Sequence, residues 1–131
     1  MVALTNDVKT LLTLTDLVLL DIKHIDPNKC KNLVGFSNQL ELAFAKYLSE
    51  NHIPIWIRQV LIPGITDDKQ DLLKLKDFIE QLESVQKVEI LPFHDLGKFK
   101  WKNLGLPYEL EHIRPATLQD VEKAKKVLGL S

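Results

Sequence analysis

Short apolar runs alternate along this chain with longer segments in which apolar residues recur every three or four positions. The short runs, rich in β-branched residues, predict strands over 17–22, 53–61 and 87–91. The longer segments predict amphipathic helices within 40–48, 72–82 and 118–128. A repeated strand-then-helix order requires crossover connections, and it therefore predicts an α/β fold with a parallel sheet.

Capping residues support the helix boundaries. Thr66 precedes two aspartates and is expected to be the N-cap of the second of these helices. Thr117 and Asp120 form a variant of the capping box, and Gly129 suits a C-cap. A further helix is expected to begin near Thr5, before the first strand.

Composition narrows the class of protein. The 131 residues, 45% of them hydrophobic, are expected to form a single domain spanning 1–131. A net charge of -1 gives no reason to expect nucleic acid or a membrane surface as partner. The single cysteine excludes an internal disulfide, and no signal peptide is evident, so the cytoplasm is the expected location.

The end of the first predicted strand carries an acidic and a basic side chain. Alternation along a strand places Asp21 and Lys23 on one face. A carboxylate and an ammonium side by side can bind a zwitterionic amino-acid group, or they can pair with each other. Asp21 can also coordinate a cation. His24 faces the other way and is expected on the polar surface, and Asp26 is expected at a turn or a helix start.

Polar residues also accompany the next two strands. Arg58 lies in an otherwise apolar run and needs a partner, which can be an anionic ligand or a structural carboxylate. Trp56, in the same run, is expected to serve in packing. His94 stands just beyond the third strand, next to Gly97, where the backbone can approach a ligand closely. A histidine with ordinary hydrogen bonds and no ligand is the alternative.

Parallel α/β proteins bind ligands outside the carboxyl ends of their strands. Asp21, Lys23, Arg58 and His94 can therefore converge on one small charged ligand. The sequence contains no glycine-rich phosphate loop, no nucleophile elbow and no His/Asp/Glu cluster with metal-ligand spacing. These residues predict a binding site and leave the reaction open.

Several motifs together resemble one known family. Their order and spacing are similar to those of pyruvate formate-lyase activating enzymes, within the radical S-adenosylmethionine (SAM) superfamily. The motifs cover nearly the whole chain, at 15–23, 32–35, 44–48, 56–58, 63–64, 91–98 and 100–101. The chain therefore resembles the C-terminal portion of such an activase.

The resemblance implies a fold, a reaction and a partner. In this family a [4Fe–4S] cluster reduces SAM, and the resulting 5′-deoxyadenosyl radical takes hydrogen from a glycine of a glycyl-radical enzyme such as pyruvate formate-lyase. The implied fold is a partial (β/α)6 barrel, of which this chain would supply three β/α units. By position, Asp21 and Lys23 match residues that bind the amino-acid part of SAM, with Asp21 also near a monovalent cation. His94 matches a histidine that contacts SAM, and Arg58 an arginine lining the same site.

The cluster-binding half of the family pattern is missing from this sequence. The family binds its cluster through Cys-x-x-x-Cys-x-x-Cys and contacts SAM through a Gly-Gly-Glu stretch, and neither motif is present. Cys30 does not match a cluster ligand, and one thiolate cannot replace three. The chain alone is therefore expected to be inactive.

Two hypotheses follow. The first is a portion of an activase whose other half supplies the cluster. The second is a non-catalytic binding or interaction module that keeps the fold and meets a partner through residues 99–101 or through an exposed sheet edge. Self-association without SAM binding would favour the second.

Overall fold

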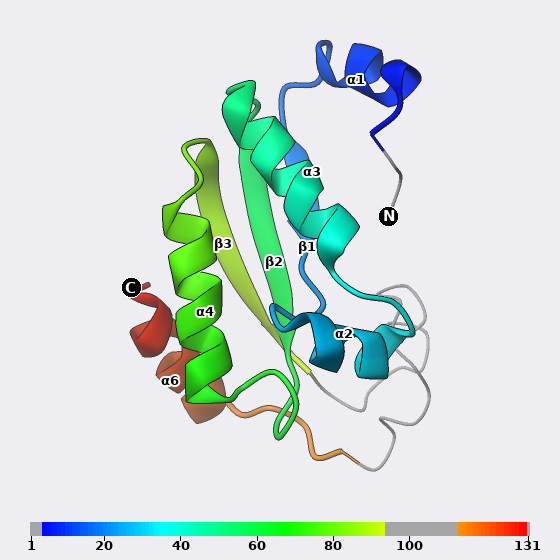
Figure 1. The fold of residues 1–131 in the computed structure, drawn as a ribbon. Helices are drawn as coiled ribbons and strands as arrows, with labels where there is room; N and C mark the ends of the chain where they lie inside the picture. The colour runs from blue at the N-terminus through cyan, green and yellow to red at the C-terminus, as the bar shows by residue number, and fades with distance from the viewer. Residues whose placement is uncertain (1–3, 94–112, 131) are drawn as a thin grey trace.

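The computed structural model describes residues 4–93 and 113–130, which contain a three-stranded sheet (Figure 1). The strands are β1 (Val18–Asp21), β2 (Ile55–Leu61) and β3 (Val85–Pro92). They lie in the order β1-β2-β3, and both pairs of neighbours are parallel. The predicted α/β class and the parallel sheet are confirmed.

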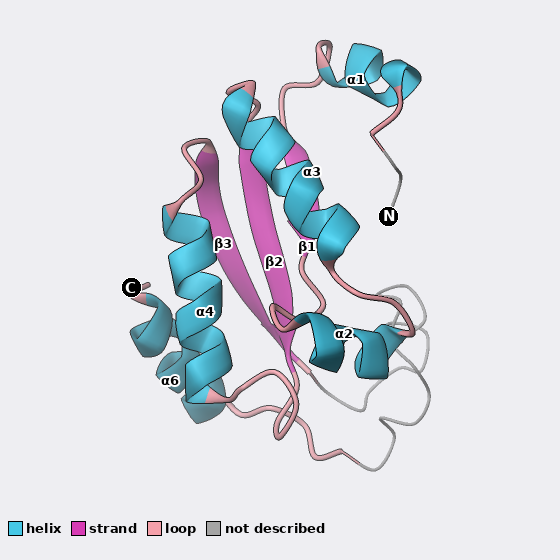
Figure 2. Cartoon of the chain, viewed as in Figure 1, coloured by secondary structure: helices cyan, strands magenta, loops and turns pink. Residues whose placement is uncertain are grey.

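Helices flank the strands. Those in the described residues are α1 (Asn6–Leu12), α2 (Pro27–Val34), α3 (Gln39–Glu50), α4 (Lys69–Glu80) and α6 (Leu118–Leu128). Helices α3 and α4 lie across one face of the sheet, and α6 packs against α4 and β3 (Figure 2). Within the described residues, none of these helices is long and apolar enough to cross a membrane.

The core lies between the sheet and helices α3 and α4. Alternate residues of β2 face it, among them Ile55 and Ile57, which have no exposed surface. Leu48 of α3 and Leu75 of α4 are also fully buried and belong to the same cluster. Burying one such side chain contributes about 1.5–3 kcal/mol, so these contacts hold both helices on the sheet.

The opposite face of the sheet is not covered by α3 or α4. Arg58 of β2 is the register partner of Asp21 in β1 and of Glu89 in β3, which places all three in one row on this face. Leu19 stands beside Trp56 in the next row and is 49% exposed. The sheet thus presents one apolar face to the helices and one mixed, partly exposed face.

Most of the predicted helix boundaries are confirmed. Thr5 caps α1, Thr117 and Asp120 form a capping box at α6, and Gly129 ends α6 with a φ of 75°. The prediction for Thr66 was wrong, because Asp68 is the N-cap of α4.

Thr66 instead closes the turn that follows β2. Its hydroxyl accepts a hydrogen bond from the backbone of Ile62 at 2.7 Å and donates one to the carbonyl of Val60 at 2.8 Å. The side chain of Asp68, two residues later, accepts from the backbone N–H groups of Gln70 and Asp71 in the first turn of α4. Thr66 is buried and stabilises the turn, and Asp68 caps α4.

Candidate functional site

An ion pair joins the carboxyl ends of β1 and β2. Arg58 donates from Nε to Oδ1 of Asp21 at 2.8 Å and from Nη2 to Oδ2 at 3.1 Å. About a third of each side chain is exposed, 29% for Arg58 and 33% for Asp21. Paired parallel bonds of this kind fix the guanidinium plane against the carboxylate. Of the two partners predicted for Arg58, the structure contains the carboxylate.

A small hollow opens beside this pair. It is lined by Asp21, Lys23 and Arg58, together with apolar residues at the same strand ends, Ile22, Val60 and Ile62. Three of the four predicted site residues therefore lie together, as expected for residues at the carboxyl ends of neighbouring parallel strands. The fourth, His94, lies outside the described residues.

Glu41 of α3 is a buried carboxyl group beside Lys23 that the sequence analysis did not consider. It is 6% exposed, and its Oε2 has no hydrogen-bond partner within the described part of the chain. Burial raises the pKa of Glu41, although a hydrogen bond from the backbone of Lys23 and the charge of that lysine act in the opposite direction. Its spacing of three, four and seven residues from the buried positions Phe44, Ala45 and Leu48 is the signal that could have revealed it.

A second charged pair lies along β3 and joins this row to the next one. Lys87 Nζ lies 2.9 Å from Oε1 of Glu89 and 5.0 Å from the centre of the Trp56 ring. Since Glu89 is the register partner of Arg58, charges of opposite sign alternate from Asp21 to Lys87 across the uncovered face. Trp56 accordingly contacts a cation on this face, a role that its prediction as a packing residue did not include.

His24 is buried, so its prediction as a surface residue was wrong. It is 1% exposed, and its Nδ1 accepts a hydrogen bond from the backbone of Asp26 at 3.1 Å. Its Nε2 therefore carries the proton and donates to the carbonyl of Ile65 at 2.9 Å. Asp71 lies 3.7 Å away from the same nitrogen and forms an ion pair with Lys29 at 2.6 Å. These contacts tie the segment after β1 to the turn after β2, which positions the hollow.

The described residues do not fit an iron–sulfur cluster. Cys30 is fully buried in α2, and burial raises the pKa of its thiol. No group of three or more His, Cys, Asp or Glu side chains that could hold a metal ion occurs in residues 4–93 and 113–130. A cluster requires several thiolates, so this part of the chain cannot hold one.

Sequence comparison finds close relatives, although no protein-family model matches the chain. It is 51% identical over 118 residues to a pyruvate formate-lyase-activating enzyme of Streptococcus mutans, which covers 90% of this chain and 45% of the relative. It is 52% identical over 117 residues to the enzyme of the same name from Staphylococcus epidermidis, covering 89% and 47%. The chain thus spans about half the length of the curated relatives that it matches.

A solved structure has the same fold. The crystal structure of a domain of pyruvate-formate lyase-activating enzyme from Bacteroides vulgatus matches with a TM-score of 0.78, over 97% of this chain and 70% of that one. At 20% identity this match supports the fold alone. The assignment to a family therefore depends on the sequence relatives. These relatives confirm the resemblance that the motifs indicated. The chain is homologous to a C-terminal portion of the pyruvate formate-lyase-activating enzymes.

Proposed function

We propose that this chain is the SAM-binding C-terminal part of an activase that generates a glycyl radical on an enzyme of the pyruvate formate-lyase type. The observation that carries the proposal is the convergence of Asp21, Lys23 and Arg58 on one hollow at the carboxyl ends of the strands. In this proposal residues 1–131 form a single domain, three β/α units of a partial (β/α)6 barrel. The uncovered sheet face would line the interior of that barrel.

The side chains at the hollow fit the amino-acid end of SAM by charge. A SAM carboxylate matches the cations of Lys23 and Arg58, and its ammonium matches the carboxylate of Asp21. Each oxygen of Asp21 accepts one bond from Arg58 and has a further lone pair, so the ligand's ammonium could donate to Asp21 while the pair stays in place. The hollow has a volume of about 10 Å³, so the amino-acid end would lie over it and not inside it. His94 remains a proposed contact to another part of SAM.

When bound, SAM would supply the 5′-deoxyadenosyl group, and this chain would orient it. The fixed guanidinium of Arg58 holds the carboxylate of Asp21 in one place, which preorganises the binding of the amino-acid end. The [4Fe–4S] cluster would have to come from a further polypeptide segment, since the described residues cannot hold it. The geometry gives no support for a monovalent cation at Asp21, which remains a prediction. The cytoplasmic location also remains a prediction.

Two measurements test the proposal. Isothermal titration should show SAM binding to this chain once it is joined to the remaining N-terminal part of the Streptococcus mutans relative. Under anaerobic reducing conditions the joined protein should cleave SAM and form 5′-deoxyadenosine, whereas the isolated chain should not. A joined protein that folds and contains its cluster but neither binds nor cleaves SAM would sink the proposal, and a non-catalytic module would then be favoured.

A further inference from the structure

A groove lies between helices α4 and α6, and none of its lining residues belongs to the hollow at Asp21. Its volume of about 560 Å³ falls within the range of sites that enclose organic ligands or short peptide segments. Its floor is apolar and is formed by Leu72 of α4 with Ala124 and Val127 of α6. An occupant would therefore gain energy from burying an apolar group.

One face of α6 lines the groove, and its apolar residues belong to the floor. Asp120, Lys123, Ala124 and Val127 recur at the spacing of a single helix face and all line it. Seven residues of helix rise by roughly 10 Å, which gives the groove its length along α6. Lys69, in the first turn of α4, lines it from the opposite side.

The polar lining is mainly cationic. Among the residues that the structure describes, the groove is lined by four cations, Lys69, Arg114, Lys123 and Lys126, and by two acidic residues, Asp67 and Asp120. The three lysines are exposed, and within the described residues no carboxylate lies within 4.0 Å of their Nζ atoms.

Both acidic residues of the groove are engaged in local contacts. Asp120 accepts from Arg114 at 2.8 and 3.2 Å and also closes the capping box of α6. The guanidinium of Arg114 holds the pKa of Asp120 far below its usual range. Asp67 accepts a hydrogen bond from the backbone of Gly64 at 2.8 Å. The lysines are thus the groups of the groove that remain for an anionic partner.

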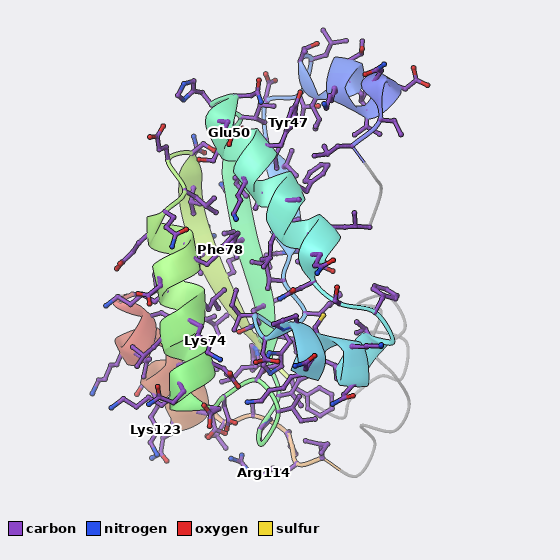
Figure 3. All side chains as sticks on the ribbon, viewed as in Figure 1. Tyr47, Glu50, Lys74, Phe78, Arg114 and Lys123 are labelled. Carbon is purple, nitrogen blue, oxygen red and sulfur yellow. The ribbon has the colours of Figure 1, made fainter. Side chains whose placement is uncertain are left out.

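One end of the groove lies at the same end of the sheet as the Asp21–Arg58 pair. The backbone of Ala116 donates to the carbonyl of Phe93 at 2.6 Å, which anchors the start of α6 just beyond the end of β3. Helix α4 begins at this end as well, and Figure 3 shows Lys123 near its first turn and Arg114 near the loop that precedes it. A protein that approaches the strand ends would meet this end of the groove.

We propose that this groove binds an acidic peptide segment of a partner protein. An apolar side chain of the segment would lie on Leu72 and Val127, and its carboxylates would pair with Lys69, Lys123 and Lys126. A peptide fits better than a compact anion, because the cations are spread along the groove and do not converge on one point. The proposal does not depend on SAM binding.

Fluorescence polarisation with the full 131-residue chain tests it. The probe is a short fluorescein-labelled peptide of Asp, Glu and Leu residues, compared with an Asn, Gln and Leu peptide of the same length. The acidic peptide should bind, and the Lys123→Gln/Lys126→Gln variant should bind it about tenfold more weakly. The matched control is Lys31→Gln/Lys46→Gln, which removes the same charge from exposed positions on α2 and α3. Thermal unfolding establishes that both variants are folded.

Three results would overturn the proposal. Equal losses in the two double variants would show attraction by net charge alone. Equal binding of the acidic and amide peptides, or no binding of either at millimolar concentration, would remove the predicted recognition of carboxylates. Displacement of the peptide by a few millimolar inorganic phosphate at constant ionic strength would identify a site for small anions instead.

Discussion

Arg58 and Asp21 form the best-defined polar contact of the candidate site, and their pairing makes a prediction at the residue scale. Lysine cannot make two parallel bonds to one carboxylate, so Arg58→Lys should loosen the pair. Because both side chains are about a third exposed, we expect the free energy of unfolding to fall by only about 0.5–1 kcal/mol in urea titrations.

Binding should change more than stability at this pair. In the joined protein, Arg58→Lys should raise the Kd for SAM about tenfold, because the carboxylate of Asp21 is no longer held in place. Arg114→Lys is the matched control, since it breaks another forked pair, to Asp120, outside the hollow. An equal rise in Kd for both variants would contradict the role assigned to Arg58.

Glu41 makes a prediction about pH. Burial raises its pKa in the folded protein above the ordinary value of 4.5, so the folded state binds more protons than the unfolded state. The stability that Glu41 contributes is therefore present below pH 4.5 and is lost as pH rises through the folded pKa. Glu41→Gln should remove this loss, which urea unfolding at several pH values from 4.5 to 8 would show. The exposed Glu50, at the far end of α3 in Figure 3, is the control: Glu50→Gln should keep the wild-type slope.

Some polar residues of the site could be predicted from the sequence and others could not. Asp21, Lys23 and Arg58 could be predicted because the ends of parallel strands always meet at one edge of the sheet. His24 was missed because a lone polar side chain was expected at the surface, although it follows the buried Leu20 and Ile22 at the same spacing of two residues. The contact of His24 with Ile65, far away in the sequence, depends on how two turns pack together.

At the scale of elements, the capping box of α6 carries a prediction. Thr117 accepts from the backbone of Asp120, and the side chain of Asp120 accepts from the backbone of Thr117. Thr117→Ala should therefore lower the free energy of unfolding by about 1 kcal/mol, measured by urea titration.

The other threonine cap provides the control for Thr117→Ala. Thr5 caps α1 through a bond of 3.3 Å, and this short helix has a single buried residue, Leu12. Thr5→Ala should cost clearly less, because α1 can fray without opening the core. If both variants lost the same stability, α6 would not be more tightly coupled to the core than α1.

The element boundaries that sequence reasoning missed depend on tertiary contacts. Residues 66–68 are three consecutive residues that can all cap a helix. Thr66 bonds to Ile62 and Val60, and Asp67 accepts from Gly64, so that Asp68 is the residue that caps α4. Strand β3 begins at Val85, before the predicted start at 87, because β2 extends the pairing by a hydrogen bond from Ile55 to the carbonyl of Ser84. A pattern of apolar residues does not reveal pairing of this kind.

At the scale of the whole molecule, the exposed edge of the sheet favours self-association. Among residues 4–93 and 113–130, the order β1-β2-β3 leaves β1 at an edge, and Leu19 lies half-exposed on the face that α3 and α4 do not cover. Unpaired strand edges beside apolar surface tend to pair with a second chain. Burying half of a leucine contributes about 1 kcal/mol, so Leu19→Lys should weaken association of the isolated chain about fivefold in sedimentation velocity runs. Leu118→Lys, at an 80% exposed position on α6, should leave association unchanged. If the two variants behaved alike, contacts elsewhere on the molecule would drive the association.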